Sequence, residues 1–183
     1  MPAAEIQTKR LRLRQLTTED THRIAELGGD WDVASMTSRM PYPYTLDAAA
    51  QWIEGLNDGE RVFGIEHEGE LIGVTGYHRD AKANSAEIGY WIGKPYWGRG
   101  FATEAASAVI DHVFRSNSAA TITCGHFDDN PASARVIEKL GFEKTGTRLW
   151  WCEARKLDHL AVRYELTKPA GFWQKLARLR PAS

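Results

Sequence analysis

Two closely spaced glycines stand directly before a strongly patterned apolar stretch. Gly98 and Gly100 precede residues 103–115, where apolar side chains recur at steps of three and four, the spacing of one helix face. The first turn of a helix has backbone N–H groups without helical partners, and the helix dipole attracts negative charge there. Glycines let a ligand approach the main chain closely. The stretch therefore predicts a phosphate-binding helix N-terminus.

Two common phosphate-binding patterns do not fit this spacing. A P-loop needs Lys followed by Ser or Thr after its glycines, and a dinucleotide-binding turn needs a third glycine where Thr103 stands. A tight turn at the start of a helix is the simpler alternative. Residues 86–92 are typical of a strand, so a ligand at the glycines would lie at the carboxyl end of that strand.

The run from Tyr96 to Ala105, Tyr-Trp-Gly-Arg-Gly-Phe-Ala-Thr-Glu-Ala, resembles the diphosphate-binding segment of the GNAT acyltransferases. The superfamily pattern begins with Arg or Gln, whereas this chain has Trp97, which is common in the RimJ/RimL-like branch. Residues 129–142 resemble the second cofactor segment of the same superfamily. The resemblance extends over roughly residues 8–167.

The resemblance implies an α/β fold of one acetyltransferase domain over residues 1–167. It implies a mixed, mostly antiparallel sheet of about seven strands, with helices on both faces and with the fourth and fifth strands splayed apart. The cofactor would be acetyl-CoA, with its pantetheine arm between the splayed strands and its diphosphate on the amides from Gly98 to Thr103.

The expected cofactor contacts follow these segments. They are the strand end Trp91, Ile92 and Gly93, the run Trp97, Gly98, Arg99, Gly100, Phe101, Ala102 and Thr103, and the side chains of Asn130 and Ser133. Asn130 followed by Pro131 is also an ordinary helix start, with Asn at the N-cap and Pro at the first helical position. The two roles of Asn130 are compatible.

Acyl transfer to an amine needs a group that takes a proton from the acceptor, and Glu87 is the candidate base. Strand alternation puts Glu87, Gly89 and Trp91 on one face, and we expect burial to raise the carboxyl pKa. The alternative is a strand carboxylate in a salt bridge. His78 and His126 are reserve candidates, each with an ordinary structural alternative.

The departing thiolate also needs a proton. Many GNAT enzymes supply it from a tyrosine in the second cofactor segment, but this chain has Ile137 there. The resemblance to RimJ/RimL-like members instead implies Ser133, with water as the alternative. Cys124 has no base at fixed spacing, so direct attack in a ternary complex is simpler than acyl transfer through a thiol.

The resemblance places the acceptor wall between the first two helices, in residues 28–44. Trp31 and Tyr42 in this segment, with Trp150 before the last strand, are the candidate substrate contacts. Such rings suit a peptide N-terminus and a small amine equally, and core packing is their alternative role.

Composition sets further limits. The chain has 183 residues, 43% of them apolar, and a net charge of −1, which indicates one domain without general attraction to nucleic acid or acidic membranes. It has no apolar run near 18 residues and no signal-peptide core, so we expect a cytoplasmic protein without a membrane span. The two cysteines and six histidines show no metal-ligand spacing, so we expect no metal.

The period of the apolar residues gives the expected elements. Strands are expected at Arg10 to Gln15, Arg61 to His67, Glu70 to Arg79, Ala86 to Ile92, Thr121 to Phe127, Phe142 to Trp151 and Leu160 to Leu166, and helices at Glu19 to Leu27, Leu46 to Leu56, Thr103 to Arg115 and Pro131 to Leu140. Residues 168–183 form a basic amphipathic tail, which we expect to pack on its own domain or in a homodimer rather than on a membrane or an acidic partner.

The resemblance implies an acetyl-CoA-dependent N-acetyltransferase that acts on a protein N-terminal α-amino group or on a small amine. An antibiotic or polyamine acetyltransferase is one variant of this function. Two hypotheses of another class stay open: a GNAT-fold domain that binds CoA without catalysis, and an interaction module whose helix N-terminus binds another phosphate ligand.

Overall fold

The computed structural model describes residues 5–56, 60–116 and 118–168 of the chain. Eight strands form one sheet in the order β1-β2-β3-β4-β5-β6-β8-β7. The strands are β1 Ile6–Gln7, β2 Arg12–Arg14, β3 Glu60–His67, β4 Glu70–Asp80, β5 Ser85–Ile92, β6 Thr121–Phe127, β7 Glu143–Cys152 and β8 Leu157–Thr167. All neighbouring pairs are antiparallel except β5 and β6. The expected mixed sheet is confirmed, with the short β1 as an additional strand.

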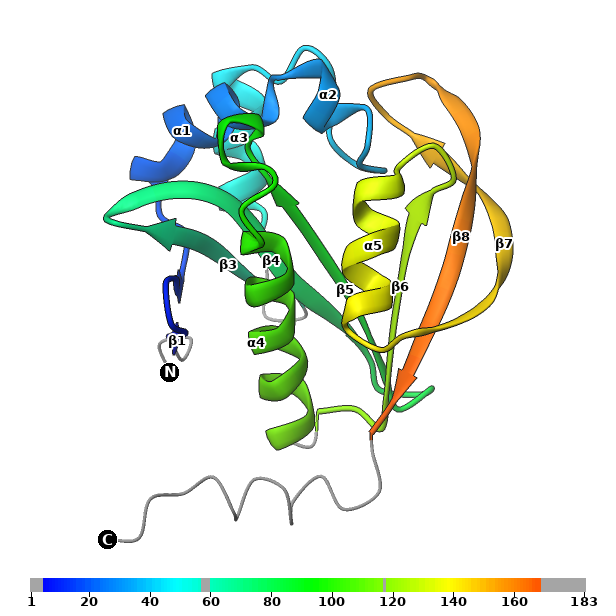
Figure 1. Cartoon of the computed structure of the whole chain (residues 1–183). Coiled ribbons are helices and arrows are strands. Elements are labelled where there is room, and N and C mark those ends of the chain that lie inside the picture. Colours follow the sequence, from blue (N-terminus) through cyan, green and yellow to red (C-terminus); the bar gives the residue numbers. More distant parts are fainter. Residues whose placement is uncertain (1–4, 57–59, 117, 169–183) are drawn as a thin grey trace, which may run out of the picture.

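Helices cover both faces of this sheet, as expected. They are α1 Thr21–Gly28, α2 Trp31–Ala34, α3 Leu46–Glu54, α4 Phe101–Arg115 and α5 Pro131–Lys139, with 3-10 turns η1 Thr18–Asp20 and η2 Lys94–Tyr96. In Figure 1, α4 and α5 lie side by side in front of the sheet. Side chains of α4 pack in one cluster with Ile72, whereas those of α1 and α3 pack on the opposite face with Val74.

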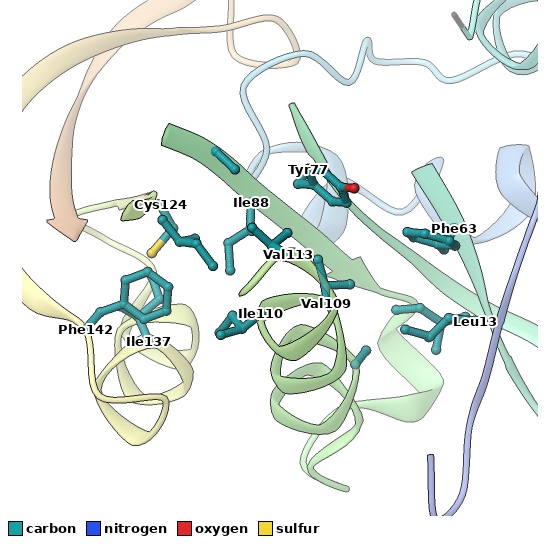
Figure 2. Close-up of a cluster of buried hydrophobic side chains, with 14 of the residues drawn as sticks. Leu13, Phe63, Tyr77, Ile88, Val109, Ile110, Val113, Cys124, Ile137 and Phe142 are labelled. Atoms are coloured by element: carbon teal, nitrogen blue, oxygen red, sulfur yellow. The ribbon is translucent and has the colours of Figure 1, made fainter. Parts of the chain in front are cut away.

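The larger core lies between α4, α5 and the sheet. Val109 and Val113 of α4 are fully buried and, with Ile110, face Ile88 of β5 (Figure 2). Ile137 of α5 joins the same cluster. Burying each such side chain contributes about 1.5–3 kcal/mol, so the apolar stripe fixes α4 against the sheet. The glycines before α4 are thereby held at one defined position.

The β3–β4 hairpin confirms the turn expected at Glu68 and Gly69. Both residues have positive φ angles, 52° and 85°. This conformation is typical of a two-residue turn whose twist matches the flanking strands. The hairpin brings β4 into the centre of the sheet, where it pairs along the whole of β5.

The ladder between β5 and β6 breaks after three residues. Ser85–Glu87 pair with Thr121–Thr123, although β5 continues to Ile92 and β6 to Phe127. Beyond this point β6 stays paired with β8, and Figure 1 shows β5 and β6 diverging toward the ends that carry α4 and α5. These strands are the expected fourth and fifth, so their splay is confirmed.

Two short elements were not expected from the sequence. β1 has two residues, too few to show alternation, and α2 has four residues within an aromatic segment. Asp30 caps α2 by accepting a hydrogen bond from the Asp32 amide at 2.8 Å. Apart from Lys168, the predicted tail lies outside the described residues. None of the described helices is long and apolar enough to cross a membrane.

Candidate active site

The start of α4 has the backbone geometry of an anion site. Gly98 and Gly100 have φ angles of 75° and 79°, a region that favours glycine. The first helical hydrogen bond runs from the Glu104 amide to the Gly100 carbonyl at 3.1 Å. The amides of residues 101–103 therefore have no hydrogen-bond partner within the helix. A Cβ atom on Gly98 would meet nothing within 4 Å. An anion can therefore reach this turn from outside.

Cationic side chains surround the same turn. The guanidinium carbons of Arg10 and Arg99 lie 4.6 and 4.7 Å from the ring centre of Phe101. Glu104 pairs with Arg10 at 2.7 Å, while Arg99 contacts His67 at 3.4 Å and has no carboxylate partner among the described residues. The positive charge of Arg99 is thus left for a ligand. The position of Arg10 at this turn was not expected from the sequence.

The carboxylate of Glu104 fixes this arrangement. Although partial burial opposes its ionisation, hydrogen bonds from Thr8 and Arg10 hold the pKa of Glu104 below its ordinary value. Thr8 Oγ1 donates at 2.7 Å and the Arg10 amide at 2.8 Å. The segment before β2 is therefore anchored to the first turn of α4.

Trp97 has a structural contact that the sequence did not predict. Its Nε1 donates a hydrogen bond to the Ile92 carbonyl at 2.6 Å, and the Gly93 amide donates one to the Ile72 carbonyl of β4 at 2.8 Å. The N–H and C=O groups of successive residues in a strand point to opposite sides. Those of Gly93 point toward β4, so the N–H and C=O groups of Tyr90 and Ile92 point toward the break. At the strand end, the groups left for a ligand in the break are those of Tyr90 and the Ile92 amide.

Ser133 and Asn130 meet on the first turn of α5. Asn130 Oδ1 accepts from the Ser133 amide at 3.0 Å, so its N-cap role is confirmed. The Ser133 hydroxyl lies 2.9 Å from the hydroxyl of Tyr90, which reaches from β5 to α5. Burial raises the pKa of Tyr90, which keeps its hydroxyl protonated at neutral pH. Tyr90 is a candidate that the sequence prediction missed.

The expectation that Glu87 is buried was wrong. Its side chain is 50% exposed, and its nearest cation is Arg163 Nη1 at 3.8 Å. Alternation correctly put Glu87 on one face with Gly89 and Trp91, but no helix covers that face at Glu87. His78 is the cross-strand neighbour of Glu87 and is also exposed. Glu87 stands where the β5–β6 ladder breaks.

The face that carries Glu87 continues across the break. A Cβ on Gly89 would meet nothing within 4 Å, whereas a Cβ on Gly125 would lie 2.5 Å from the ring of Trp150. Arg163 is the cross-strand partner of Gly125 and stacks on Trp150 with its guanidinium carbon 5.3 Å from the ring centre. An open floor at Gly89 is therefore bordered by a carboxylate, a guanidinium and an indole.

The other two expected substrate contacts lie in the connection from α1 to α3. Trp31 and Tyr42 form an edge-to-face pair with ring centres 4.9 Å apart, and both are 44% exposed. Val33 and Met40 of the same connection pack in one cluster with Trp150 and Trp91. The structure thus brings this connection against the Trp150 side of the break.

The thiol Cys124 and the reserve base His126 have structural roles. Cys124 is buried, and burial raises the pKa of its thiol to about 12, so it stays neutral and weakly nucleophilic. His126 is buried on the opposite face from Glu87, with Nδ1 2.7 Å from the Phe127 carbonyl and Nε2 3.2 Å from the Tyr164 hydroxyl.

One group has the composition of a metal site. Asp128, Asp129 and His159 bring ligand atoms within 4.8 Å of one another. Arg155 already pairs with Asp129 at 2.7 Å, and His159 Nε2 lies 3.0 Å from Asp128. The Arg155–Asp129 ion pair and the close His159–Asp128 contact account for this arrangement.

Comparisons with known proteins agree with the fold. Residues 10–143 match the acetyltransferase (GNAT) domain model, and the chain belongs to this family. It is 31% identical over 176 residues to the uncharacterized N-acetyltransferase YoaA of Bacillus subtilis, which covers 90% of this chain and 97% of that one. It is 36% identical over 83 residues to the ribosomal-protein-serine acetyltransferase of Escherichia coli, covering 45% and 46%.

Among solved structures, the fold is similar to that of the ribosomal L7/L12 α-N-protein acetyltransferase RimL in complex with coenzyme A. The TM-score is 0.78 at 18% identity, covering 90% of this chain and 98% of that one. The chain is therefore a GNAT-family acetyltransferase that uses acetyl-CoA, and its relatives include ribosomal-protein acetyltransferases.

Proposed function

We propose that the protein transfers the acetyl group of acetyl-CoA to a primary amine, either a protein N-terminal α-amino group or a small amine, by direct attack in a ternary complex. One observation carries this proposal. Where the β5–β6 ladder breaks, the Tyr90–Ser133 hydroxyl pair lies on the α5 side and Glu87 lies on the opposite face. A thioester in the break has a proton donor on one side and an acceptor site on the other.

In this proposal the diphosphate rests on the amides from Gly98 to Thr103, and Arg99 adds positive charge. The pantetheine arm runs along the main chain of Tyr90 and Ile92. The amine nitrogen attacks the thioester carbon, and its surplus proton passes to Glu87 directly or through water. The C–S bond breaks, and the thiolate takes a proton from Ser133, whose hydroxyl Tyr90 holds. The proton held by Glu87 then returns through water to Ser133.

The exposure of Glu87 agrees with a base that works through water. A half-exposed carboxylate beside Arg163 has water within reach. Such a base is available to acceptors of different sizes, because the floor at Gly89 is open. We place the reaction in the cytoplasm, which cell fractionation tests, and light scattering in solution tests whether the protein is a homodimer.

The test is thiol release from acetyl-CoA with a panel of N-terminal peptides, polyamines, amino acids and aminoglycosides. The cofactor position is checked with Gly100→Asp and its matched control Gly100→Asn. Both side chains tolerate a positive φ, but only Asp puts a negative charge beside the diphosphate. We expect the KM for acetyl-CoA to rise about 100-fold in the Asp variant and only a few-fold in the Asn variant. Equal effects of the two substitutions would place the diphosphate elsewhere. If none of the amines supported thiol release, a domain that binds CoA without catalysis would be favoured.

A further inference from the structure

Three hydrogen-bond donors gather at Trp150, on the face of the sheet that carries Glu87, which we call the acceptor face. Trp150 Nε1 is buried and has no hydrogen-bond partner in the described part of the chain. The guanidinium carbons of Arg148 and Arg163 each lie 5.3 Å from the Trp150 ring centre. A buried N–H without a partner costs free energy, and a polar ligand would remove that cost. These three donors belong to one site on β7 and β8.

Some arginines in this chain have close carboxylate partners. Arg14 pairs with Asp20 at 2.8 Å, and Arg155 pairs with Asp129 at 2.7 Å. By contrast, Arg148 has no ion pair within residues 5–56, 60–116 and 118–168, and Arg163 has only the 3.8 Å contact with Glu87. Like Arg99, these two arginines lack a close carboxylate partner in the described structure, and they lie beside the unpartnered Trp150 Nε1.

Acidic neighbours do not supply the missing partner. Glu165 lies two residues from Arg163, on the same face of β8, and is exposed next to Glu143 of β7. Neither of these carboxylates forms an ion pair with Arg148 or Arg163 in the described structure. The donors at Trp150 therefore remain available to a ligand.

We propose that the amine acceptor carries a carboxylate a few bonds from its amino group, and that Arg163, Arg148 and Trp150 Nε1 bind this carboxylate. The inference rests on the proposed function, because it places the amine at Glu87. Glu87, Arg163, Trp150 and Arg148 follow one another across the face, so the amine and the carboxylate lie at neighbouring positions. Guanidinium groups bind carboxylates through two parallel hydrogen bonds, and the indole N–H adds a third donor.

The carboxylate can come from a peptide side chain or from a free amino acid, and matched acceptors separate these sources. One pair is a peptide with Glu or Gln at its second residue, and the other is a free amino acid and its carboxamide. We expect the carboxylate member of one pair to have a kcat/KM about tenfold higher in the thiol-release assay. A preference within the peptide pair would identify a peptide side chain as the source of the carboxylate, and a preference within the other pair would identify a free amino acid.

Three variants test the residues. Arg148→Gln should remove most of the preference, because it should lower kcat/KM for the carboxylate member much more than for the neutral member. Trp150→Phe keeps a ring but lacks the N–H, so it should remove part of the preference. Arg115→Gln, an exposed arginine at the end of α4, is the control and should change nothing.

The outcomes separate this inference from the proposed function. Failure of every amine would reject the proposed function itself. Turnover with equal kcat/KM for both members of each pair would overturn the inference and leave the function intact. A loss in Arg148→Gln that is the same for charged and neutral acceptors would also overturn it, because it would show a structural role. Melting temperatures of the variants identify any that fail to fold.

Discussion

The two sides of the β5–β6 break are built differently. On the α5 side, a serine hydroxyl, a tyrosine hydroxyl and an N-cap form a closed set of hydrogen bonds. On the opposite face, Gly89 has open space above it, Glu87 is half exposed and Trp150 Nε1 has no partner in the described structure. Side chains that already bond to one another suit the binding of an invariant cofactor. Hydrogen-bond donors without a partner suit the recognition of a particular acceptor.

The cofactor side also depends less on side-chain identity. The α4 turn offers main-chain amides held by glycines with positive φ, and any residue supplies such amides. The acceptor face instead offers the side chains of Glu87, Arg148, Arg163 and Trp150, so its chemistry depends on residue identity. Changes on the first side should therefore alter acetyl-CoA binding or the leaving group, whereas changes on the second should alter the acceptor.

The largest expected effect is at Glu87. Glu87→Gln keeps the shape but cannot accept the proton, so kcat should fall about 100-fold with little change in the KM for acetyl-CoA. The matched control is Glu165→Gln, another exposed strand carboxylate on the same face, which should retain wild-type kcat. Similar losses in both variants would mean that general charge on this face matters, and not a base at Glu87.

A smaller effect is expected on the α5 side. Ser133→Ala and Tyr90→Phe should each lower kcat about tenfold, because each removes one hydroxyl of the pair. If Tyr90 acts by holding Ser133, the second substitution should add little to the first. A double-mutant cycle on kcat measures this, with unfolding free energies measured in parallel. Fully additive losses would show that the two hydroxyls act independently.

Two glycines of the acceptor face give a matched test of its open floor. Gly125→Ala should lower the unfolding free energy by about 1–3 kcal/mol, because its Cβ would meet Trp150 at 2.5 Å and the Val162 carbonyl at 2.8 Å. Gly89→Ala should leave stability nearly unchanged and should raise only the acceptor KM. Chemical denaturation and steady-state kinetics separate the two effects. A destabilised Gly89→Ala would show that the floor is covered.

The smallest effect is expected at Cys124. Because its thiol is buried and its pKa is raised to about 12, it should carry no acyl group at neutral pH. Cys124→Ala should keep kcat within about twofold and lower the unfolding free energy by about 1 kcal/mol. Loss of turnover in a folded variant, or an acetylated Cys124 found by mass spectrometry, would contradict direct attack.

Much of the fold followed from the sequence because its signals are local. The apolar stripe of α4, the alternation in β5 and the Asn-Pro start of α5 each lie within one segment. The Tyr90–Ser133 contact and the Glu87–Arg163 contact join segments far apart in the chain, so periodicity could not reveal them. Alternation correctly gave the face of Glu87. Whether that face is covered depends on where α1 to α3 pack, which the sequence does not encode locally.

The central claim is that donor and acceptor meet across the break in one ternary complex. Initial rates of thiol release, measured while acetyl-CoA and an active amine are both varied, test this most directly. We predict double-reciprocal lines that intersect, because both substrates must be bound before the C–S bond breaks. Parallel lines would contradict the account, because they would show that the acetyl group passes to the protein before the amine binds.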